Sequence, residues 1–195
     1  MRPGTVPFDA MKRFSITISD ARLEAITEAD FETVAHLGET IWRTHYSKII
    51  SGAQIDYMLA GRYTPDKLRK YLNADDRWMV LLKLAGKPVG YCSYARTSTP
   101  CEMKLEQLYL LQEYQGKGLG GLMLHHVESR ALRYGLSVLM LQVNIRNVNS
   151  IAFYRKDGFT IREEAIFDIG NGFYMDDYVM EKTLRAGSTN INDRI

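Results

Sequence analysis

The chain contains 195 residues, of which 46% are hydrophobic, enough for one well-buried domain and little more. Its 25 basic and 23 acidic residues nearly balance, and no long run of lysine and arginine indicates a nucleic-acid partner. No stretch of about 18 apolar residues could form a transmembrane helix, and the N-terminus lacks the apolar core of a signal peptide. We therefore expect a cytoplasmic protein that binds neither nucleic acid nor membrane.

Composition divides the chain into three parts. Residues 1–15 carry prolines and a glycine without any periodicity, which predicts an N-terminal extension. Residues 16–186 show regular patterns without a repeat or linker, and we expect one domain there. Residues 187–195 are polar and are expected to form a flexible tail. The two cysteines, Cys92 and Cys101, are too few for a disulfide framework, so buried free thiols are expected.

The patterns within the domain predict a mixed α/β fold, because apolar residues recur at helical spacing in some segments and form short β-rich runs in others. The expected strands cover 21–26, 78–84, 88–96, 103–111, 137–144, 158–168 and 173–182. The expected helices begin near Thr27, Gly52, Pro65, Leu119 and Asn147. The strands over 103–111 and 137–144 are joined by a helix, so we expect them to be parallel.

The strongest chemical signal of the sequence is a glycine-rich turn. The run Gln115-Gly116-Lys117-Gly118-Leu119-Gly120 follows the strand over 103–111 and opens a helix. A helix start after such a turn presents free backbone N–H groups at the positive end of the helix dipole, an arrangement that binds phosphate. Glycine is needed because a side chain would hold the ligand away from the backbone.

Other kinds of glycine-rich turn fit the sequence less well. Gly116, Gly118 and Gly121 match the dinucleotide-binding fingerprint, but the next strand does not end in the acidic residue that this fingerprint expects about 20 positions later. The P-loop pattern is excluded because no Gly-Lys-Ser/Thr follows. A tight turn without a ligand is the remaining alternative.

A second motif follows the strand over 137–144. Asn147 and Ser150 open a helix that carries Tyr154, and Gly158-Phe159 closes it. With the glycine turn, these residues resemble the signature of the GCN5-related N-acetyltransferases, in which Gln/Arg-x-x-Gly-x-Gly/Ala precedes Asn-x-x-Ala/Ser-x-x-x-Tyr-x-x-x-Gly-Phe. The resemblance implies the fold of that family, a mixed central sheet of about six or seven strands with helices on both faces and splayed central parallel strands.

The resemblance also implies that acetyl-CoA is the cofactor and indicates how it lies. Its pantetheine arm pairs with the central strand like an added strand, the glycine turn takes the pyrophosphate, and the following helix faces the thioester. The implied contacts are Leu108, Tyr109 and Leu110 on the strand, Gln115, Gly116, Lys117, Gly118, Leu119 and Gly120 in the turn, and Asn147, Ser150 and Tyr154 on the helix.

Two residues are predicted to be catalytic. Amine attack on a thioester expels a thiolate, and a phenol within hydrogen-bond reach can protonate or stabilise that sulfur, so Tyr154 is the expected general acid. Glu106 interrupts the central strand, where a buried carboxylate is costly without compensation. Glu106 is therefore predicted to be the general base or an ammonium anchor. Core packing of Tyr154 and an ordinary salt bridge of Glu106 are the alternatives.

The acceptor is expected to be a small primary amine. The region over 42–72, together with Asp176-Asp177-Tyr178, resembles the spermidine acetyltransferases of the PaiA type, which implies a polyamine. The implied substrate contacts are Glu106, Trp42, Tyr46, Asp56 and Asp177. Acidic side chains at Asp56, Glu106, Asp176 and Asp177 would suit a polycation if they converged. Acetylation of a protein N-terminus and a non-catalytic acyl-CoA sensor are the alternatives.

The histidines and cysteines give no further chemistry. His125 and His126 lie mid-helix without a second ligand at metal spacing, so no metal is expected. Neither cysteine has a histidine in an arrangement that would support an acyl-cysteine intermediate. The N-terminal extension and the edge strands are compatible with a homodimer.

Overall fold

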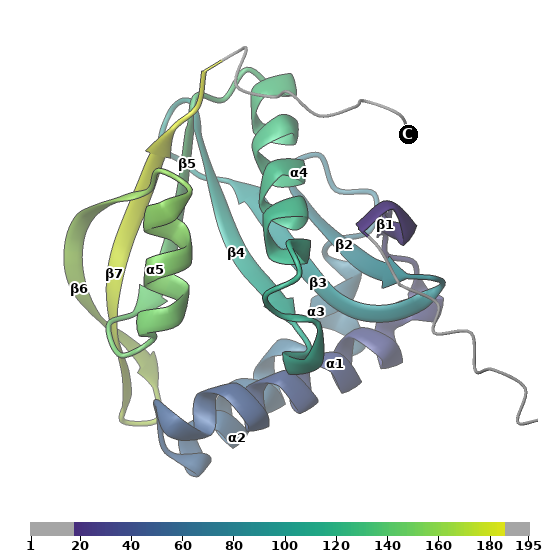
Figure 1. Ribbon diagram of the computed structural model, residues 1–195. Coiled ribbons are helices and arrows are strands. Elements are labelled where there is room, and N and C mark those ends of the chain that lie inside the picture. The colour runs from purple at the N-terminus through teal and green to yellow at the C-terminus, as the bar shows by residue number, and fades with distance from the viewer. Residues whose placement is uncertain (1–17, 186–195) are drawn as a thin grey trace, which may run out of the picture.

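The computed structural model describes residues 18–185 (Figure 1). The extension predicted over 1–15 and the tail predicted over 187–195 lie outside the described residues. Seven strands form one sheet in the order β1-β2-β3-β4-β5-β7-β6. The strands are β1 (Ala21–Ala25), β2 (Arg77–Leu84), β3 (Lys87–Arg96), β4 (Glu102–Leu110), β5 (Val138–Asn144), β6 (Thr160–Gly170) and β7 (Phe173–Thr183). The predicted α/β class and strand number are confirmed.

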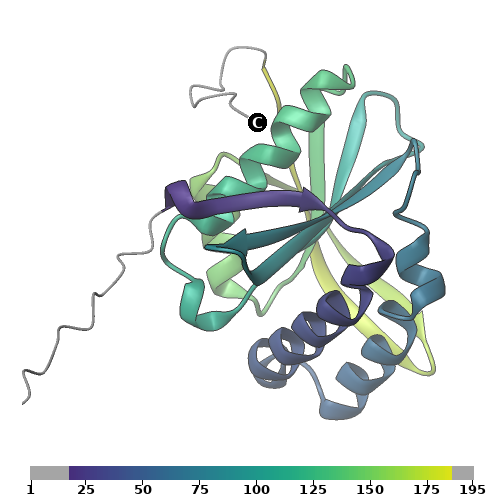
Figure 2. The ribbon, with the colours of Figure 1, turned by 90° about the vertical axis from the view of Figure 1, so that its right-hand side faces the viewer.

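Five α-helices cover the sheet within the described residues. They are α1 (Phe31–His45), α2 (Gly52–Arg62), α3 (Pro65–Arg69), α4 (Leu119–Arg133) and α5 (Val148–Lys156). The helices α4 and α5 lie on one face of the sheet, and α1, α2 and α3 lie on the other (Figures 1 and 2). Helices on both faces agree with the prediction. No helix among the described residues has the length and apolar character needed to cross a membrane.

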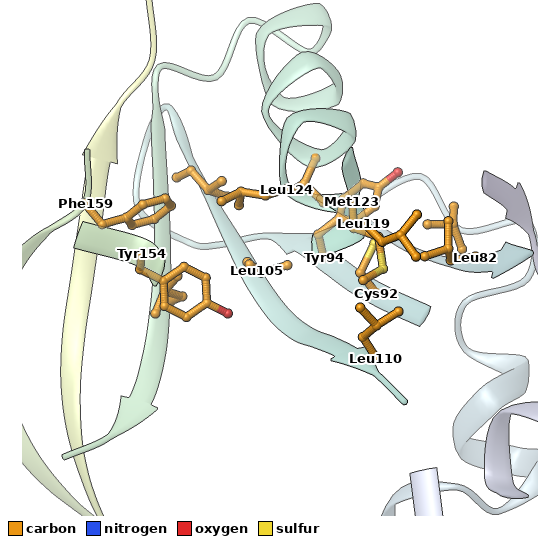
Figure 3. Packing of buried hydrophobic residues seen from close by; sticks show 14 of the residues in the cluster. Leu82, Cys92, Tyr94, Leu105, Leu110, Leu119, Met123, Leu124, Tyr154 and Phe159 are labelled. Atoms are coloured by element: carbon orange, nitrogen blue, oxygen red, sulfur yellow. The ribbon is translucent and has the colours of Figure 1, made fainter. Parts of the chain in front are cut away.

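Each face of the sheet has its own hydrophobic core. On the α4 face, Met123 and Leu124 are fully buried against strand residues such as Cys92 (Figure 3). On the other face, Val34 of α1 and Leu68 of α3 are fully buried in a second cluster. Burial of one such aliphatic side chain contributes about 1.5–3 kcal/mol. The two cores therefore hold both helical layers firmly against the sheet.

Two local predictions have different outcomes. The capping pattern at Thr27 is present, because Thr27 N donates to Asp30 Oδ2 (2.9 Å) in a short 3₁₀ turn that leads into α1. Of the two cysteines, Cys92 is buried as expected, but the prediction of burial is wrong for Cys101. Cys101 lies in the turn before β4 with a positive φ of 61°, and this turn places it at the surface.

The parallel strands β4 and β5 form the centre of the sheet and separate along their length. They pair from Glu102–Val138 to Leu105–Leu141, although both strands continue further. On its other edge β4 pairs with β3 as far as Leu110. Figure 1 shows the gap between β4 and β5 widening towards α1 and α2. The edge of β4 over 106–110 that faces β5 is therefore without a strand partner, and this feature positions the site.

Candidate active site

Two cavities adjoin where β4 and β5 separate. The first cavity has a volume of about 90 Å³ and lies between β4, β5 and the start of α5. The second cavity has a volume of about 840 Å³ and lies among β4, the α2–α3 region and the β6–β7 hairpin. Glu106 and Tyr109 of β4 and Gln142 of β5 line both. Ligands in the two cavities can therefore meet at this junction.

The first cavity suits an extended ligand that carries amide groups. The residues of β4 from Glu106 to Leu110 line it, and their free edge can accept or donate hydrogen bonds as another strand would. Gln115 Nε2 donates to the carbonyl oxygen of Leu110 (3.1 Å), so this side chain fixes the glycine turn to the end of β4. The pantetheine arm of coenzyme A, with its two amides, fits such an edge.

The glycine turn forms an open backbone cradle at the start of α4. Gly116 and Gly118 have φ angles of 73° and 81°, which side chains rarely adopt. Gly118 caps α4 without a side-chain hydrogen bond, so the first N–H groups of this 15-residue helix remain available to an anion. The side chain of Leu119 is buried in the core, and only its backbone belongs to the cradle. Lys117 Nζ lies 5.4 Å from the Tyr114 ring centroid.

The predicted helix residues Asn147, Ser150 and Tyr154 all line the first cavity. Asn147 also caps α5, because its side chain accepts a hydrogen bond from Ser150 N (3.4 Å). Tyr154 lies one turn later, buried between the rings of Phe153 and Phe159. Its hydroxyl points into the space between β5 and β4 (Figure 3) and has no hydrogen-bond partner within residues 18–185. Burial raises the pKa of Tyr154, so the phenol keeps its proton.

A β-bulge directs Glu106 towards the second cavity. Ser93 of β3 pairs with Gln107 and Tyr94 pairs with Leu105, so Glu106 is the extra residue. The bulge lets the side chains of Glu106 and Gln107, although adjacent, face the same side of the sheet. The Tyr71 hydroxyl donates to Glu106 Oε2 (2.9 Å), and the Tyr63 hydroxyl donates to Gln107 Oε1 (3.2 Å). The ordinary salt bridge considered for Glu106 is not formed among the described residues.

An aromatic cluster forms the wall of the second cavity next to this junction. The rings of Trp42 and Tyr46 stack with centroids 4.3 Å apart, and Tyr109 lies edge-on to both. Tyr46 and Tyr109 line both cavities, whereas Trp42 lines only the second. The structure therefore brings the predicted residues Trp42 and Tyr46 to the site. Close-packed rings of this kind exclude water from a reacting centre.

The predicted acidic residues do not all converge. Asp177 lines the second cavity and is buried, with Oδ1 lacking any hydrogen-bond partner among the described residues. Burial raises the pKa of the Asp177 carboxyl to about 6. Asp56 does not line either cavity, because its side chain is exposed and pairs with Arg43 (2.8 Å) on the outer surface of the helical layer. The exposed Asp176 also lies outside both cavities.

We expect Asp177→Asn to stabilise the protein at neutral pH. The folded protein holds the Asp177 proton more tightly than the unfolded chain, so ionisation of this carboxyl lowers the free energy of unfolding as the pH rises from about 4 to about 6, and the full cost remains above that. This cost is about 1–2 kcal/mol at pH 8, after allowance for partial solvation, and it vanishes below pH about 4. Urea unfolding of both proteins between pH 4 and 8 measures the difference. A difference that does not change with pH would contradict this account, and Asp176→Asn is the exposed control.

Sequence reasoning did not identify the basic side chains of the site. Five of them line the second cavity: Arg62, Lys67, Lys70, Arg77 and Lys104. They come from α2, α3, the residue after α3, β2 and β4, so no spacing pattern within one segment predicts that they line the same cavity. Within residues 18–185, no three histidine, cysteine, aspartate or glutamate side chains come together as a metal site.

This combination of splayed parallel strands, a glycine cradle at a helix start and a tyrosine on the next helix defines an N-acetyltransferase. The chain belongs to the acetyltransferase (GNAT) family, whose model matches residues 42–159. It is therefore an acetyltransferase that uses acetyl-CoA, as predicted.

Individual relatives are distant but extend over most of the chain. An uncharacterised N-acetyltransferase of the pepI 3′ region of Lactobacillus delbrueckii subsp. lactis is 22% identical over 173 residues, covering 86% of this chain and 99% of that protein. A spermidine N(1)-acetyltransferase of Thermoplasma acidophilum is 25% identical over 138 residues, covering 69% of this chain and 84% of that protein. The crystal structure of PaiA N-acetyltransferase from Thermoplasma acidophilum, in complex with coenzyme A, has a TM-score of 0.71 and 23% identity, covering 84% of this chain and 98% of that chain. This structural likeness shows that the fold is the same.

Proposed function

We propose that this enzyme acetylates a primary amine by direct attack on acetyl-CoA at the junction of the two cavities. The observation that carries the proposal is that Glu106 lines both cavities while Tyr154 lines the first. An acetyl donor along β4 and an amine in the second cavity would then meet beside these two side chains. Holding both reactants together in this geometry removes most of the entropic cost of the encounter.

The donor side provides binding and orientation. Bound there, acetyl-CoA supplies an acetyl thioester. The free edge of β4 over 106–110 holds the pantetheine amides, and the backbone N–H groups after Gly118 hold the pyrophosphate. Asn147 and Ser150 border the thioester end of the cavity. These contacts fix the reactive carbonyl close to the junction.

In the proposed step, a nitrogen–carbon bond replaces the carbon–sulfur bond of the thioester, one proton leaves the nitrogen and one reaches the sulfur. The amine nitrogen forms a bond to the acetyl carbon, and the carbon–sulfur bond breaks. Tyr154 supports the departing sulfur, because its buried phenol remains protonated and has no competing partner among the described residues. An ammonium group first loses one proton to a carboxylate or water, which leaves the neutral amine that attacks. In the step itself the nitrogen loses one further proton to a carboxylate or water, and the sulfur gains one to end as the coenzyme A thiol.

Two carboxylates line the second cavity, where they can bind the amine or accept its proton. Glu106 borders the junction itself, where it can orient an ammonium group or take its proton. Asp177 lies in the second cavity only, and its raised pKa of about 6 suits a group that accepts a proton near neutral pH. We propose that Glu106 positions the amine and that Asp177 receives the proton, directly or through water.

The acceptor class predicted from the sequence is a polyamine such as spermidine. The similarity to a spermidine acetyltransferase and the presence of Glu106 and Asp177 in the second cavity support this class. The positions of Asp56 and Asp176 outside the cavity, and its basic lining, weigh against it. The N-terminal amine of a protein is the second candidate, supported by the size of the cavity, about 840 Å³. A homodimer stays a prediction.

The experiment that tests the proposed function is coenzyme A thiol release from acetyl-CoA with a panel of amines. The panel contains spermidine, a small diamine, amino acids and an N-terminal peptide. We expect saturable release with at least one primary amine, and mass spectrometry should find the acetyl group on its nitrogen. Tight coenzyme A binding without release for any amine would favour the sensor alternative.

A further inference from the structure

We infer that the acceptor amine carries an anionic group, a carboxylate or a phosphate, which the basic side chains of the second cavity bind. This inference rests on the proposed function and names its substrate class. The cavity is lined by five basic side chains and by two carboxylates, Glu106 and Asp177. Binding an additional cation there is unfavourable, whereas an anion would be attracted.

Most of the basic groups are not neutralised by the protein itself. Arg62, Lys67 and Lys70 form no ion pair with any described residue, and Lys104 donates to the neutral amide of Gln142. Only Arg77 is paired, with Asp76 (3.1 Å). Uncompensated charges of one sign that line a large cavity are typical of a binding site for the opposite charge.

Arg62 is the basic group best prepared for a ligand. It ends α2, and its guanidinium lies 5.3 Å from the Trp42 ring centroid, within the range of a cation–π contact. A guanidinium keeps its charge at every physiological pH and offers paired N–H donors that match a carboxylate or a phosphate. Lys67 and Lys70 are exposed at and just after α3, where they can reach a flexible anionic group.

The charged residues of the second cavity differ in whether they also line the first. Glu106 lines both cavities, but none of the five basic residues lines the first. Glu106 therefore marks the junction, whereas Asp177 and the basic residues, among them the exposed Lys67 and Lys70, belong to the second cavity alone. A substrate with an amine at one end and an anion at the other matches this order. Its anion would hold the molecule while its amine reaches the thioester.

The test compares matched pairs of amines that differ only in the anion. The pairs are lysine with 1,5-diaminopentane, phosphoethanolamine with ethanolamine, and an acidic dipeptide with its neutral amide. We expect kcat/KM to be at least about tenfold higher for the anionic member of one or more pairs. The carboxylate and phosphate pairs distinguish the two sources of the anion. Equal or better turnover of the partners that lack the anion, or of spermidine, would overturn the inference.

Variants of the basic residues test whether the second cavity causes the preference for the anionic amines. Arg62→Gln should lower the ratio within the preferred pair to about threefold or less, chiefly by raising KM for the anionic member. Because Arg62 packs on Trp42, the exposed double variant Lys67→Gln with Lys70→Gln provides a second test with little risk to folding. Arg43→Gln removes a charge from the same helical layer outside the cavity and should leave the ratio unchanged. An unchanged ratio in both cavity variants would overturn the assignment.

A binding measurement keeps this inference separate from the proposed function. Inorganic phosphate is titrated into the enzyme saturated with coenzyme A, so that the glycine turn is already occupied. We expect binding that weakens in Arg62→Gln and in the lysine double variant, but not in Arg43→Gln. Absence of phosphate binding together with equal turnover of paired amines refutes only the inference. Absence of turnover for every amine refutes the proposed function.

Discussion

Tyr154→Phe is expected to lower kcat by about a hundredfold to a thousandfold while coenzyme A binds with nearly unchanged affinity. Phenylalanine keeps the ring that packs between Phe153 and Phe159, so α5 and the first cavity retain their shape. Only the hydroxyl is lost, and it has no other hydrogen-bond partner among the described residues. Initial rates of thiol release and titration calorimetry with coenzyme A measure the two effects.

The matched control for this change is Tyr178→Phe. Tyr178 is a partly buried tyrosine packed against the same core, and it lines neither cavity. The activity of Tyr178→Phe should stay within about twofold of the wild type, because a substitution outside both cavities removes no transition-state contact. If Tyr154→Phe retained full kcat, the hydroxyl would have no part in the departure of the sulfur, and Tyr154 would be a core residue only.

The elements around the first cavity could be predicted because their determinants are local. The strand over 103–111, the turn with Gly116 and Gly118, and the helix that carries Tyr154 follow one another in the chain. The positive φ angles of both glycines are what a tight turn before a helix requires. The parallel pairing of β4 and β5 follows from the helix that joins them. Local sequence patterns are therefore sufficient to predict these elements, whereas their contacts with acetyl-CoA stay a proposal that the family resemblance implies.

The lining of the second cavity could not be predicted because its determinants are distant in sequence. The bulge at Glu106 depends on the register between β3 and β4, which no pattern within β4 records. Arg62 and Lys104 come from α2 and β4 and meet only through the packing of the helical layer. The same packing turns Asp56 outward to pair with Arg43. Counting acidic residues along the chain therefore predicted a more acidic cavity than the fold builds.

Glu106→Gln is expected to lower kcat/KM for the amine by about a hundredfold. Glutamine has the same shape, and its Oε1 can still accept the hydrogen bond that the Tyr71 hydroxyl gives to Glu106 (2.9 Å), so the bulge remains. What is lost is the negative charge at the junction of the cavities. Steady-state kinetics with the amine as variable substrate, at saturating acetyl-CoA, measure this effect.

The split between kcat and KM then separates the two roles of Glu106. Loss of an ammonium anchor raises KM and leaves kcat nearly unchanged, whereas loss of a base lowers kcat and alters its dependence on pH. If Asp177 receives the proton, the rise of kcat/KM through pH about 6 persists in Glu106→Gln and disappears in Asp177→Asn. Glu164→Gln, an exposed carboxylate on β6 outside both cavities, is the control. Activity of Glu106→Gln equal to that of this control would show that the carboxylate at the junction is dispensable.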